Sequence, residues 1–526
     1  NLKSENYIES LIEKNLISNS HRLNYSLIPD TEFNRKNEEK IQQKVIEKTR
    51  DLSHKDKEDI IQLANDLESR QNAHDDPEIL PKVTKNDIPQ SRTYACPVIS
   101  SHNSNSSYFY KTGTNGIVYH SMLFPCDALN QNELKVASLF TSTLTDIGLG
   151  EDSYEDIQKY QSSITGGISA SFVTLPNKED DSYKLALKVS SKSLEKNDLL
   201  MQDLMLKTVN ESSFLEQNRI KELLEFISAD NEKSVIQNGH ILSMGNAASQ
   251  ISSIAATNDL TSGLQFIHNT NNLSRLMNDE NEFKLYLDTL HSIKNKLSSD
   301  PNYLFTASSL DINDLKLNTI FKSEPINFNN QSFVATQDSS IGWITGSQVC
   351  FCAEAFPSVD SMHEDAPALT ILGTVLRNGY LHSAIREKGG AYGSGAAQDS
   401  NNKVFKFFSY RDPKCSETFE EFQKSRDWSL KEISAEQLEE GILGVISSID
   451  KPLSPYGEAM SDFMSELDNN TQDERLLFRS RVKGCTLSDL ARVSEKYLFN
   501  DSKKSVIAGK NFIKELTDQG FAIKNI

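Results

Sequence analysis

The segment of this chain best suited to chemistry spans residues 378–395 and reads Asn-Gly-Tyr-Leu-His-Ser-Ala-Ile-Arg-Glu-Lys-Gly-Gly-Ala-Tyr-Gly-Ser-Gly. It places Arg386 and Tyr392 on either side of the pair Gly389 and Gly390. A guanidinium offers a fixed fork of donors to a carbonyl or carboxylate, and a phenol donates one hydrogen bond. Glycines let the backbone turn tightly or approach another chain closely. Spacing alone leaves a plainer alternative open, a helix-to-strand turn in which Arg386 pairs with a surface carboxylate and Tyr392 caps the core.

A phosphate-binding loop is a third interpretation of the same glycines, and the sequence disfavours it. The Walker pattern is absent, and the chain carries a net charge of −19. The same acidity weighs against nucleic acid as a partner, because phosphate binding needs a basic stripe. The charge is typical of a soluble surface, and it also permits attraction of basic peptides into a cleft.

Metal ligands are sparse. The ten histidines include no pair within five residues of each other, so neither H-x-x-E-H nor H-E-x-x-H occurs. Cys350 and Cys352 alternate on one strand face, where we expect small buried hydrophobes rather than ligands. For His120 and His382 we favour packing or surface roles over ligation. We therefore predict no metal site in this chain.

The elements around the segment indicate an α+β chain with a repeat. Asp365 is placed to cap a helix over 368–376, which has Pro367 in its first turn, and a strand follows the glycine pair. An earlier unit has the same order, with a strand over 116–124, a helix over 133–146 and a second strand that opens at Gly166 and Gly167. Each unit closes with an apolar strand after helices, at 303–307 and at 505–508. Two duplicated sheet-plus-helices domains account for this order.

The region before the repeat predicts a helix over 7–17, a short strand at Leu23, Tyr25 and Leu27, and an antiparallel helical hairpin over 35–71. Because one helix and one strand cannot bury a core, we interpret residues 1–30 as the end of a preceding domain. Residues 31–88 then form the hairpin linker, and the two duplicated domains occupy 89–325 and 326–526. No stretch approaches 18 apolar residues, so we predict no membrane span. Six cysteines in 526 residues are too few for a disulfide scaffold, and we predict a reducing compartment.

The run Arg386-Glu-Lys-Gly-Gly-Ala-Tyr392 closely resembles the C-terminal substrate motif of the pitrilysin/insulinase superfamily of zinc peptidases. Further segments are similar to its presequence-protease branch, which includes falcilysin-like enzymes. They are Glu68-Ser-Arg-Gln71, Asp87-Ile-Pro89, Thr114-Asn-Gly-Ile-Val118, Thr165-Gly-Gly-Ile-Ser169, Ser409-Tyr-Arg-Asp-Pro413 and Gly444-Val-Ile-Ser-Ser-Ile-Asp-Lys-Pro-Leu-Ser-Pro455. The resemblance covers essentially the whole chain and makes it a C-terminal half. Residues 89–325 then correspond to the family's third domain and residues 326–526 to its fourth.

The resemblance implies a clamshell metalloendopeptidase that degrades unstructured peptides in a closed chamber. Zinc in the complete enzyme would be held by the N-terminal half, which is then this chain's partner, and none would be held here. Arg386 and Tyr392 would act across the chamber on the substrate and the oxyanion, and Gly389, Gly390 and Ala391 would contact the substrate. The resemblance and the cysteine content fit a bacterial cytoplasm or a mitochondrial or other organellar matrix. The alternative is a non-catalytic, peptidase-like subunit that binds an active partner, and in either case this chain alone is expected to be inactive.

Overall fold

The computed structural model describes residues 6–30, 32–72, 81–102, 105–177, 180–315, 330–332 and 340–526. By its internal contacts the chain divides into two units, 1–82 and 83–526. The predicted domain boundary at residue 325 lies outside the described residues. Among the described residues, no helix is both long enough and apolar enough to cross a membrane.

The described residues of the first unit form three helical segments. Helix α1 (Tyr7–Ile12) runs on into a π-helical turn (Glu13–Ile17), as the apolar spacing predicts. Helices α2 (Phe33–Arg50) and α3 (His54–Asn72) confirm the two helices of the expected hairpin. Between them, Ser53 and Asp56 form the reciprocal bonds of a capping box, with Ser53 N donating to Asp56 Oδ2 at 2.8 Å and Asp56 N donating to Ser53 Oγ at 3.2 Å.

Two expectations for this unit are not met. The strand predicted at Leu23, Tyr25 and Leu27 is not formed, and all three side chains are more than 80% exposed. A strand exists only as part of a hydrogen-bonded ladder, and the described residues provide no partner for this one. The apolar stripes of α2 and α3 are also exposed, so the two helices do not bury each other's apolar faces as a packed hairpin would.

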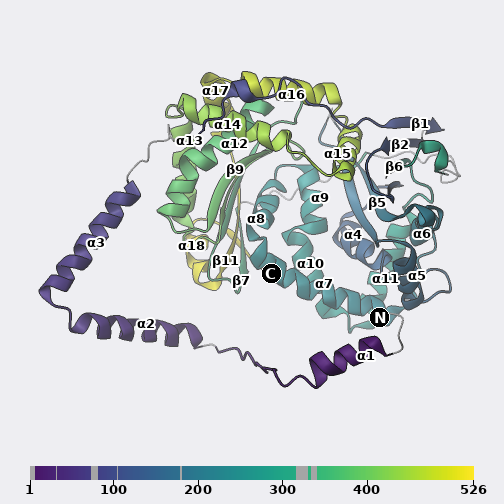
Figure 1. The fold of residues 1–526 in the computed structure, drawn as a ribbon, viewed down its shortest axis with the longest axis horizontal. Coiled ribbons are helices and arrows are strands. Elements are labelled where there is room, and N and C mark those ends of the chain that lie inside the picture. The colour runs from purple at the N-terminus through teal and green to yellow at the C-terminus, as the bar shows by residue number, and fades with distance from the viewer. Residues whose placement is uncertain are drawn as a thin grey trace. The chain divides into compact units, whose positions relative to one another are not determined.

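The second unit is built on two six-stranded sheets (Figure 1). The first sheet has the order β1-β2-β6-β3-β5-β4 and contains β1 (Val98–His102), β2 (Asn105–Lys111), β3 (Ile117–Cys126), β4 (Ile168–Pro176), β5 (Tyr183–Leu194) and β6 (Tyr303–Ser308). The second has the order β12-β7-β11-β8-β10-β9 and contains β7 (Ile341–Thr345), β8 (Phe351–Pro357), β9 (Gly393–Asp399), β10 (Val404–Tyr410), β11 (Lys503–Gly509) and β12 (Ala522–Asn525).

Five strands of each sheet follow the same path, and this confirms the predicted duplication. The run β2-β6-β3-β5-β4 corresponds position by position to β7-β11-β8-β10-β9. In both sheets the closing strand pairs in parallel with the first strand of that run, β6 with β2 and β11 with β7. The strands predicted before and after each glycine pair are β3 and β4 in the first sheet and β8 and β9 in the second. We use the expected names third domain for the first sheet with the helices that follow its strands, and fourth domain for the second sheet with its helices.

Each sheet has its own helices. Those that follow the strands of the first sheet are α4 (Gln131–Leu144), α5 (Tyr154–Ile164), α6 (Asp198–Asn210), α7 (Gln217–Gln237), α8 (Gly239–Ala248), α9 (Ser253–Ser262), α10 (Leu264–Leu276) and α11 (Glu280–Asn295). The helices of the fourth domain are α12 (Ala366–Leu376), α13 (Ser416–Ser429), α14 (Ala435–Ile449), α15 (Pro455–Leu467), α16 (Gln472–Gly484), α17 (Leu487–Leu498) and α18 (Ile513–Asp518).

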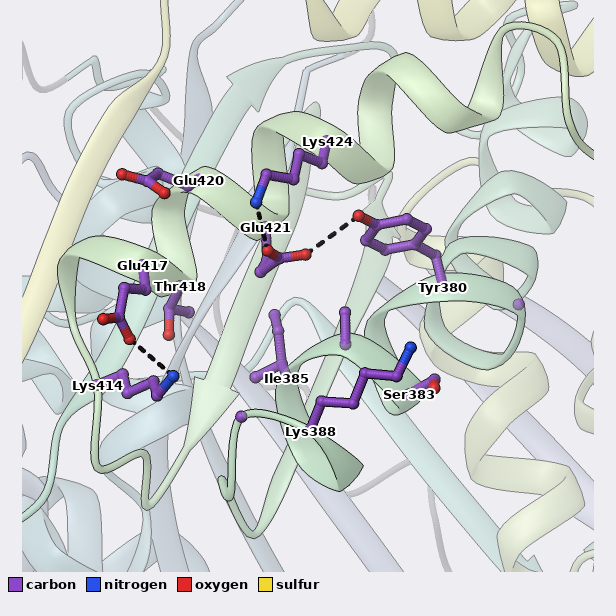
Figure 2. Close-up of a pocket in the computed structure, with 13 residues that line it drawn as sticks. Tyr380, Ser383, Ile385, Lys388, Lys414, Glu417, Thr418, Glu420, Glu421 and Lys424 are labelled. Carbon is purple, nitrogen blue, oxygen red and sulfur yellow. Dashed lines mark hydrogen bonds and ion pairs between the residues drawn. The ribbon is translucent and has the colours of Figure 1, made fainter. Parts of the chain in front are cut away.

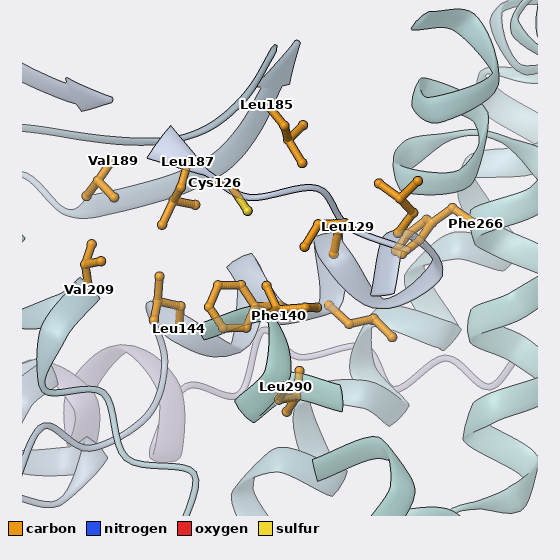
Figure 3. Close-up of a cluster of buried hydrophobic side chains, with 14 of the residues drawn as sticks. Cys126, Leu129, Phe140, Leu144, Leu185, Leu187, Val189, Val209, Phe266 and Leu290 are labelled. Carbon is orange, nitrogen blue, oxygen red and sulfur yellow. The ribbon is translucent and has the colours of Figure 1, made fainter. Parts of the chain in front are cut away.

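The core of the third domain lies between the first sheet and its helices (Figure 3). Leu187 and Val189 of β5 point toward Phe140 and Leu144 of α4, with Leu290 of α11 behind them. All five side chains are at most 1% exposed. The fourth domain has a second core of the same kind, centred on α12 and the strands β8 and β10.

The opposite face of each sheet is covered in part by a helix of the other domain. Phe463 of α15 packs on Tyr108 and Phe305 of the first sheet, with ring centroids 5.2 and 5.3 Å apart. Helix α8 lies on the second sheet, where Asn246 Oδ1 accepts hydrogen bonds from Trp343 Nε1 at 3.0 Å and from Ser505 Oγ at 2.9 Å. This exchange of helices holds the two domains together as one unit.

The segment that enters the first sheet is tied to helices of the fourth domain. Ile88 is buried in the fourth-domain core, and Arg479 Nη2 donates to the carbonyl of Pro89 at 2.9 Å. Arg479 also pairs with Asp450 at 2.6 Å. The stretch before β1 therefore packs on the fourth domain although it leads into the third.

Candidate functional site

The helix that leads to the candidate site is anchored at its start by Asp365. This residue holds the N-cap position of α12, as predicted, but its side chain makes no capping bond. Its carboxylate is fully buried and accepts hydrogen bonds from Arg492 at 2.5 Å, Lys496 at 2.8 Å and Tyr497 at 2.7 Å. Burial alone raises the pKa of this carboxyl, but the bonds from Lys496, Tyr497 and Arg492 outweigh it and lower the pKa to about 2.

Helix α12 continues directly as a π-helix over Arg377–Glu387. Gly373 allows α12 to lie close to β9, because a Cβ there would be 3.0 Å from the carbonyl oxygen of Ala396. Within the π-helix Leu381 and Ile385 are buried while Arg386 is exposed. π-Helical stretches are rare and occur often at functional sites. Here the stretch points Arg386 away from the core that Ile385 enters.

A tight turn follows, and both glycines are needed for it. Gly390 has φ +86°, a left-handed conformation that side chains disfavour. A Cβ on Gly389 would lie 2.4 Å from the carbonyl oxygen of Ile385. The turn is closed by hydrogen bonds from Gly390 N to the Arg386 carbonyl at 3.0 Å and from Ala391 N to the Ile385 carbonyl at 3.1 Å. The glycines thus allow the tight turn that the sequence indicated.

Tyr392 emerges from this turn at the start of β9. Its backbone N–H donates to the carbonyl of Tyr410 at 3.0 Å, and its ring meets the Tyr410 ring edge-to-face at 5.5 Å. The side chain is 66% exposed, and its hydroxyl has no hydrogen bond among the described residues. Tyr392 therefore does not cap the core, and its donor is free.

Tyr410, which supports Tyr392, lies in the segment Ser409–Pro413 that carries part of the resemblance, but no role was predicted for it. Its ring packs on Phe351 of β8 at 5.7 Å and on His240 of α8 at 4.6 Å. Burial lowers the pKa of His240. Because α8 comes from the third domain, the aromatic stack beneath Tyr392 is shared between domains. The pattern of apolar positions in one strand gives no signal for such a contact.

Arg386 lies before the glycine turn, six residues ahead of Tyr392. Its Nη1 is 3.3 Å from Nε2 of His382, whose Nδ1 is 3.6 Å from Glu387. Within the described part of the chain no carboxylate is paired with Arg386. The plainer alternative, an arginine held by a surface carboxylate, is thus not what the structure shows, and His382 has the surface position expected of it.

A cavity of about 610 Å³ lies on the other side of the same turn, between the π-helix and α13 (Figure 2). Lys388 and Gly389 line it, whereas Arg386 and Tyr392 do not. Its charged walls are largely paired internally, with Glu421 joined to Tyr380 at 3.1 Å and to Lys424 at 2.7 Å. Burial and the bond to Glu421 raise the pKa of Tyr380 to about 12. The candidate site residues Arg386 and Tyr392 are therefore separate from this cavity.

The cysteines and histidines considered as metal ligands are part of the core or the surface. Cys350 and Cys352 are fully buried, and the fold adds Cys415, whose Sγ is 3.9 Å from that of Cys352. His120 is buried between Asp198, at 2.7 Å, and Thr306, at 2.9 Å. Among the described residues, no group of three or more His, Cys, Asp or Glu side chains is arranged to hold a metal ion.

Comparison with known proteins places these features in a family. A family model for the associated domain of peptidase family M16, subfamily C, matches residues 27–273, and one described as "PreP C-terminal domain" matches residues 347–510. Among solved structures, a protease from Helicobacter pylori aligns with a TM-score of 0.55 and 13% identity. The alignment covers 79% of this chain and 100% of the H. pylori chain. A peptidase M16 inactive domain from Pseudomonas fluorescens aligns with a TM-score of 0.55 and 16% identity, over 78% of this chain and 97% of that domain. The fold is that of the M16 peptidase domains.

The curated relatives narrow this class. "Presequence protease, mitochondrial" of Yarrowia lipolytica is 26% identical over 520 residues, which are 95% of this chain and 51% of that protein. The protein of the same name in Saccharomyces cerevisiae is 26% identical over 549 residues, which are 100% of this chain and 54% of that protein. The chain thus spans about half the length of the curated relatives it matches. The two family models and the curated relatives thus match it to the C-terminal half of a presequence-protease-like M16 peptidase.

Proposed function

We propose that this chain forms the substrate-side wall of a zinc metalloendopeptidase that degrades unstructured peptides in a closed chamber. The observation that carries the proposal is the presentation of Tyr392. Tyr392 is 66% exposed and follows a turn closed by two hydrogen bonds. Arg386, on the other side of that turn, has no carboxylate partner among the described residues. A phenol without a hydrogen bond among the described residues, together with an arginine that contacts only His382 there, is suited to an anionic or carbonyl-bearing substrate.

The proposed roles follow from the donors. The neutral phenol of Tyr392 would donate a hydrogen bond to the oxyanion that forms when a peptide carbonyl is attacked. The fork of Arg386 would hold a substrate carbonyl or carboxylate. Gly389, Gly390 and Ala391 are proposed to contact the substrate backbone.

The turn limits how that contact is made. The N–H groups of Gly390 and Ala391 are already used within the turn, at 3.0 and 3.1 Å from their acceptors. Ala391 is also buried, at 4% exposure. The proposed contribution of these residues is therefore close approach at the exposed Gly390, whose carbonyl accepts no hydrogen bond among the described residues, with Ala391 supporting the turn from inside.

Zinc does not fit the donor sets that this chain provides among its described residues. We therefore place the metal of the proposed enzyme in the N-terminal half, which is the proposed partner, and assign no step at the metal to residues of this chain. The relatives are named as mitochondrial proteins, and we propose an organellar matrix or a bacterial cytoplasm as the compartment.

A second candidate function is a non-catalytic subunit that binds peptides or an active peptidase. The similarity to a solved M16 domain described as inactive favours it. The two functions differ in what happens when the chain is combined with an N-terminal half. If this chain is half of a peptidase, the combined protein cleaves peptides and its turnover depends on Tyr392. If the chain is a binding subunit, turnover does not depend on Tyr392.

Tyr392→Phe in the complete protein tests the proposed function. We expect kcat to fall by about 10²–10³-fold, as when one oxyanion donor is removed. The melting temperature should stay within about 1 °C, because the hydroxyl makes no hydrogen bond among the described residues and surface changes cost little. The matched control is Tyr160→Phe, since Tyr160 is also exposed, at 41%, and lies in the third domain on α5. An unchanged kcat in the Tyr392 variant would remove this residue from the mechanism.

A further inference from the structure

The first sheet has an open area on the face that α15 partly covers. Antiparallel register places Tyr119 of β3 opposite Lys192 of β5, and Lys188 of β5 opposite Ser171 of β4. Residues paired directly across neighbouring strands share a face, so these side chains lie on one side of the sheet. Helix α15 reaches as far as Tyr119, whose ring stacks on Tyr456 at 4.3 Å. Beyond that contact, Lys192 and Ser171 are exposed.

A cavity of about 360 Å³ lies at the edge of this area. Tyr119 and Tyr456 form its aromatic wall, and Gly167, Ser169 and Lys192 line the side toward β4. Gly167 has φ +100°, and no atom lies within 4 Å of the position its Cβ would take. The cavity therefore combines an apolar surface, a lysine and an open stretch of backbone.

Lys188 and Lys192 form what we call the lysine strip. Neither residue has an ion-pair partner within the described part of the chain. Burial lowers the pKa of Lys188, and no neighbouring carboxylate opposes this effect. Lysines without an ion pair are common among the described residues, but Lys188 and Lys192 share one face of β5, Lys192 lines the cavity and Lys188 is partly buried. They favour a carboxylate supplied by another molecule.

The strand next to the lysine strip is suited to bind an extended chain. β4 is the last strand of the first sheet among the described residues, so one row of its backbone N–H and C=O groups is not used in that sheet. The positions opposite the two lysines are small: Ser171 pairs with Lys188, and the register continued by one residue beyond Ile168 and Ser191 places Gly167 opposite Lys192. A peptide paired with β4 would lie two strand spacings from β5, about 10 Å, which a lysine and a glutamate side chain together span. Small residues on β4 leave that path open.

The spacing of the two lysines sets a pattern for the ligand. They are four residues apart on one strand, which corresponds to about 13 Å. Carboxylates four positions apart in an extended peptide lie at the same distance on one face. We propose that the lysine strip and the edge of β4 form a second peptide-binding site, which takes an extended segment bearing carboxylates about four residues apart.

The fold supports this assignment by its duplication. Gly166 and Gly167 precede β4 as Gly389 and Gly390 precede β9, so the turn beside the lysine strip is the third-domain counterpart of the turn before Tyr392. In each case a helix of the other domain begins beside the turn, with Tyr456 near the start of α15 and His240 near the start of α8. The inference rests on the proposed role of the chain in binding peptides and adds a second contact, selective for negative charge, to it.

Direct binding to the 526-residue chain tests the site. The probe is a fluorescein-labelled peptide of alternating Thr and Val with two Glu four positions apart, and its partner carries Gln in place of both Glu. Each ion pair should contribute about two- to fivefold in affinity, so the Glu peptide should bind about tenfold more tightly by fluorescence anisotropy. Lys188→Gln and Lys192→Gln should each weaken binding of the Glu peptide by about two- to fivefold and leave the affinity for the Gln peptide unchanged. Lys514→Gln, an equal charge change at an exposed lysine of α18, is the control.

The outcomes separate the possibilities. Loss of binding on amidation of the peptide's C-terminus, with the Glu side chains dispensable, would overturn the inference, because carboxylates four residues apart would then not be what the site recognises. Equal binding of both peptides, or lysine variants that bind as the wild type does, would overturn the inference, as would displacement by RNA without preference for the Glu peptide. A chain that binds neither peptide also overturns it. The proposed function fails separately, by an unchanged kcat in Tyr392→Phe.

Discussion

The buried carboxylate of Asp365 gives a quantitative prediction for the fourth domain. Its side chain is fully buried and held by Arg492, Lys496 and Tyr497, and its pKa is lowered from 3.8 to about 2. A shift of that size corresponds to at most about 2.5 kcal/mol of folding free energy. Because Arg492 and Lys496 are half exposed, water and salt screen them. We therefore expect Asp365→Asn to cost about 1–2 kcal/mol at pH 7.

The pH dependence of this cost has a definite sign. A carboxyl whose pKa is lower in the folded state stabilises the fold at all pH values above its unfolded pKa, here 3.8. That contribution disappears as the pH falls toward the folded pKa of about 2. The difference between the wild type and Asp365→Asn should thus be constant from pH 7 to pH 5 and fall to about half by pH 3.

The chain provides a probe for this domain. Its two tryptophans, Trp343 in β7 and Trp428 in α13, both lie in the fourth domain. Urea unfolding followed by tryptophan fluorescence at several pH values therefore reports on the domain that contains Asp365. Asp501→Asn, at an exposed carboxylate in a loop, is the control and should change stability by less than about 0.5 kcal/mol. A cost for Asp365→Asn that stays the same at pH 7 and pH 3 would refute the electrostatic account.

Two further substitutions test the turn and the exchange of helices. Gly389→Ala should lower both the melting temperature and kcat of the complete protein more than Gly390→Ala does, because its Cβ meets the carbonyl oxygen of Ile385 at 2.4 Å. Gly390→Ala should cost only about 1 kcal/mol, the strain of a left-handed residue, and equal melting temperatures would contradict this ranking. Phe463→Ala removes a fully buried ring between the domains and should cost about 3–5 kcal/mol in thermal unfolding. Phe499→Ala, at 43% exposure, is its control, and an equal loss in both variants would refute the interdomain role.

Much of the fold could be predicted because its signals are local. The strands β3 and β8, the helices α4 and α12 and the closing strands β6 and β11 all occur where apolar spacing and turn residues predicted them. The glycine pair also showed where each turn lies. These features depend on neighbours in the sequence, which one chain is sufficient to reveal.

The features that the sequence did not predict are contacts between residues far apart in the chain. Asp365 was correctly placed at the start of α12, but its carboxylate binds α17, more than a hundred residues away. The stretch around Tyr25 has the alternation of a strand without a partner to pair with. Cys415 joins the other two core thiols only because the fold brings α13 against β8. Periodicity shows which face of an element is apolar, and it does not show what covers that face.

The exchange of α8 and α15 also explains how the candidate site is held. Tyr392 rests on Tyr410, and Tyr410 rests on His240, which the third domain contributes. The equivalent contact of Tyr456 on Tyr119 has the fourth domain supporting the third. Each domain thus supplies the helix that fixes the turn of the other. Because the aromatic support of each turn comes from the other domain, separating the domains should disturb both sites together, and the position of Tyr392 depends on residues far from its motif.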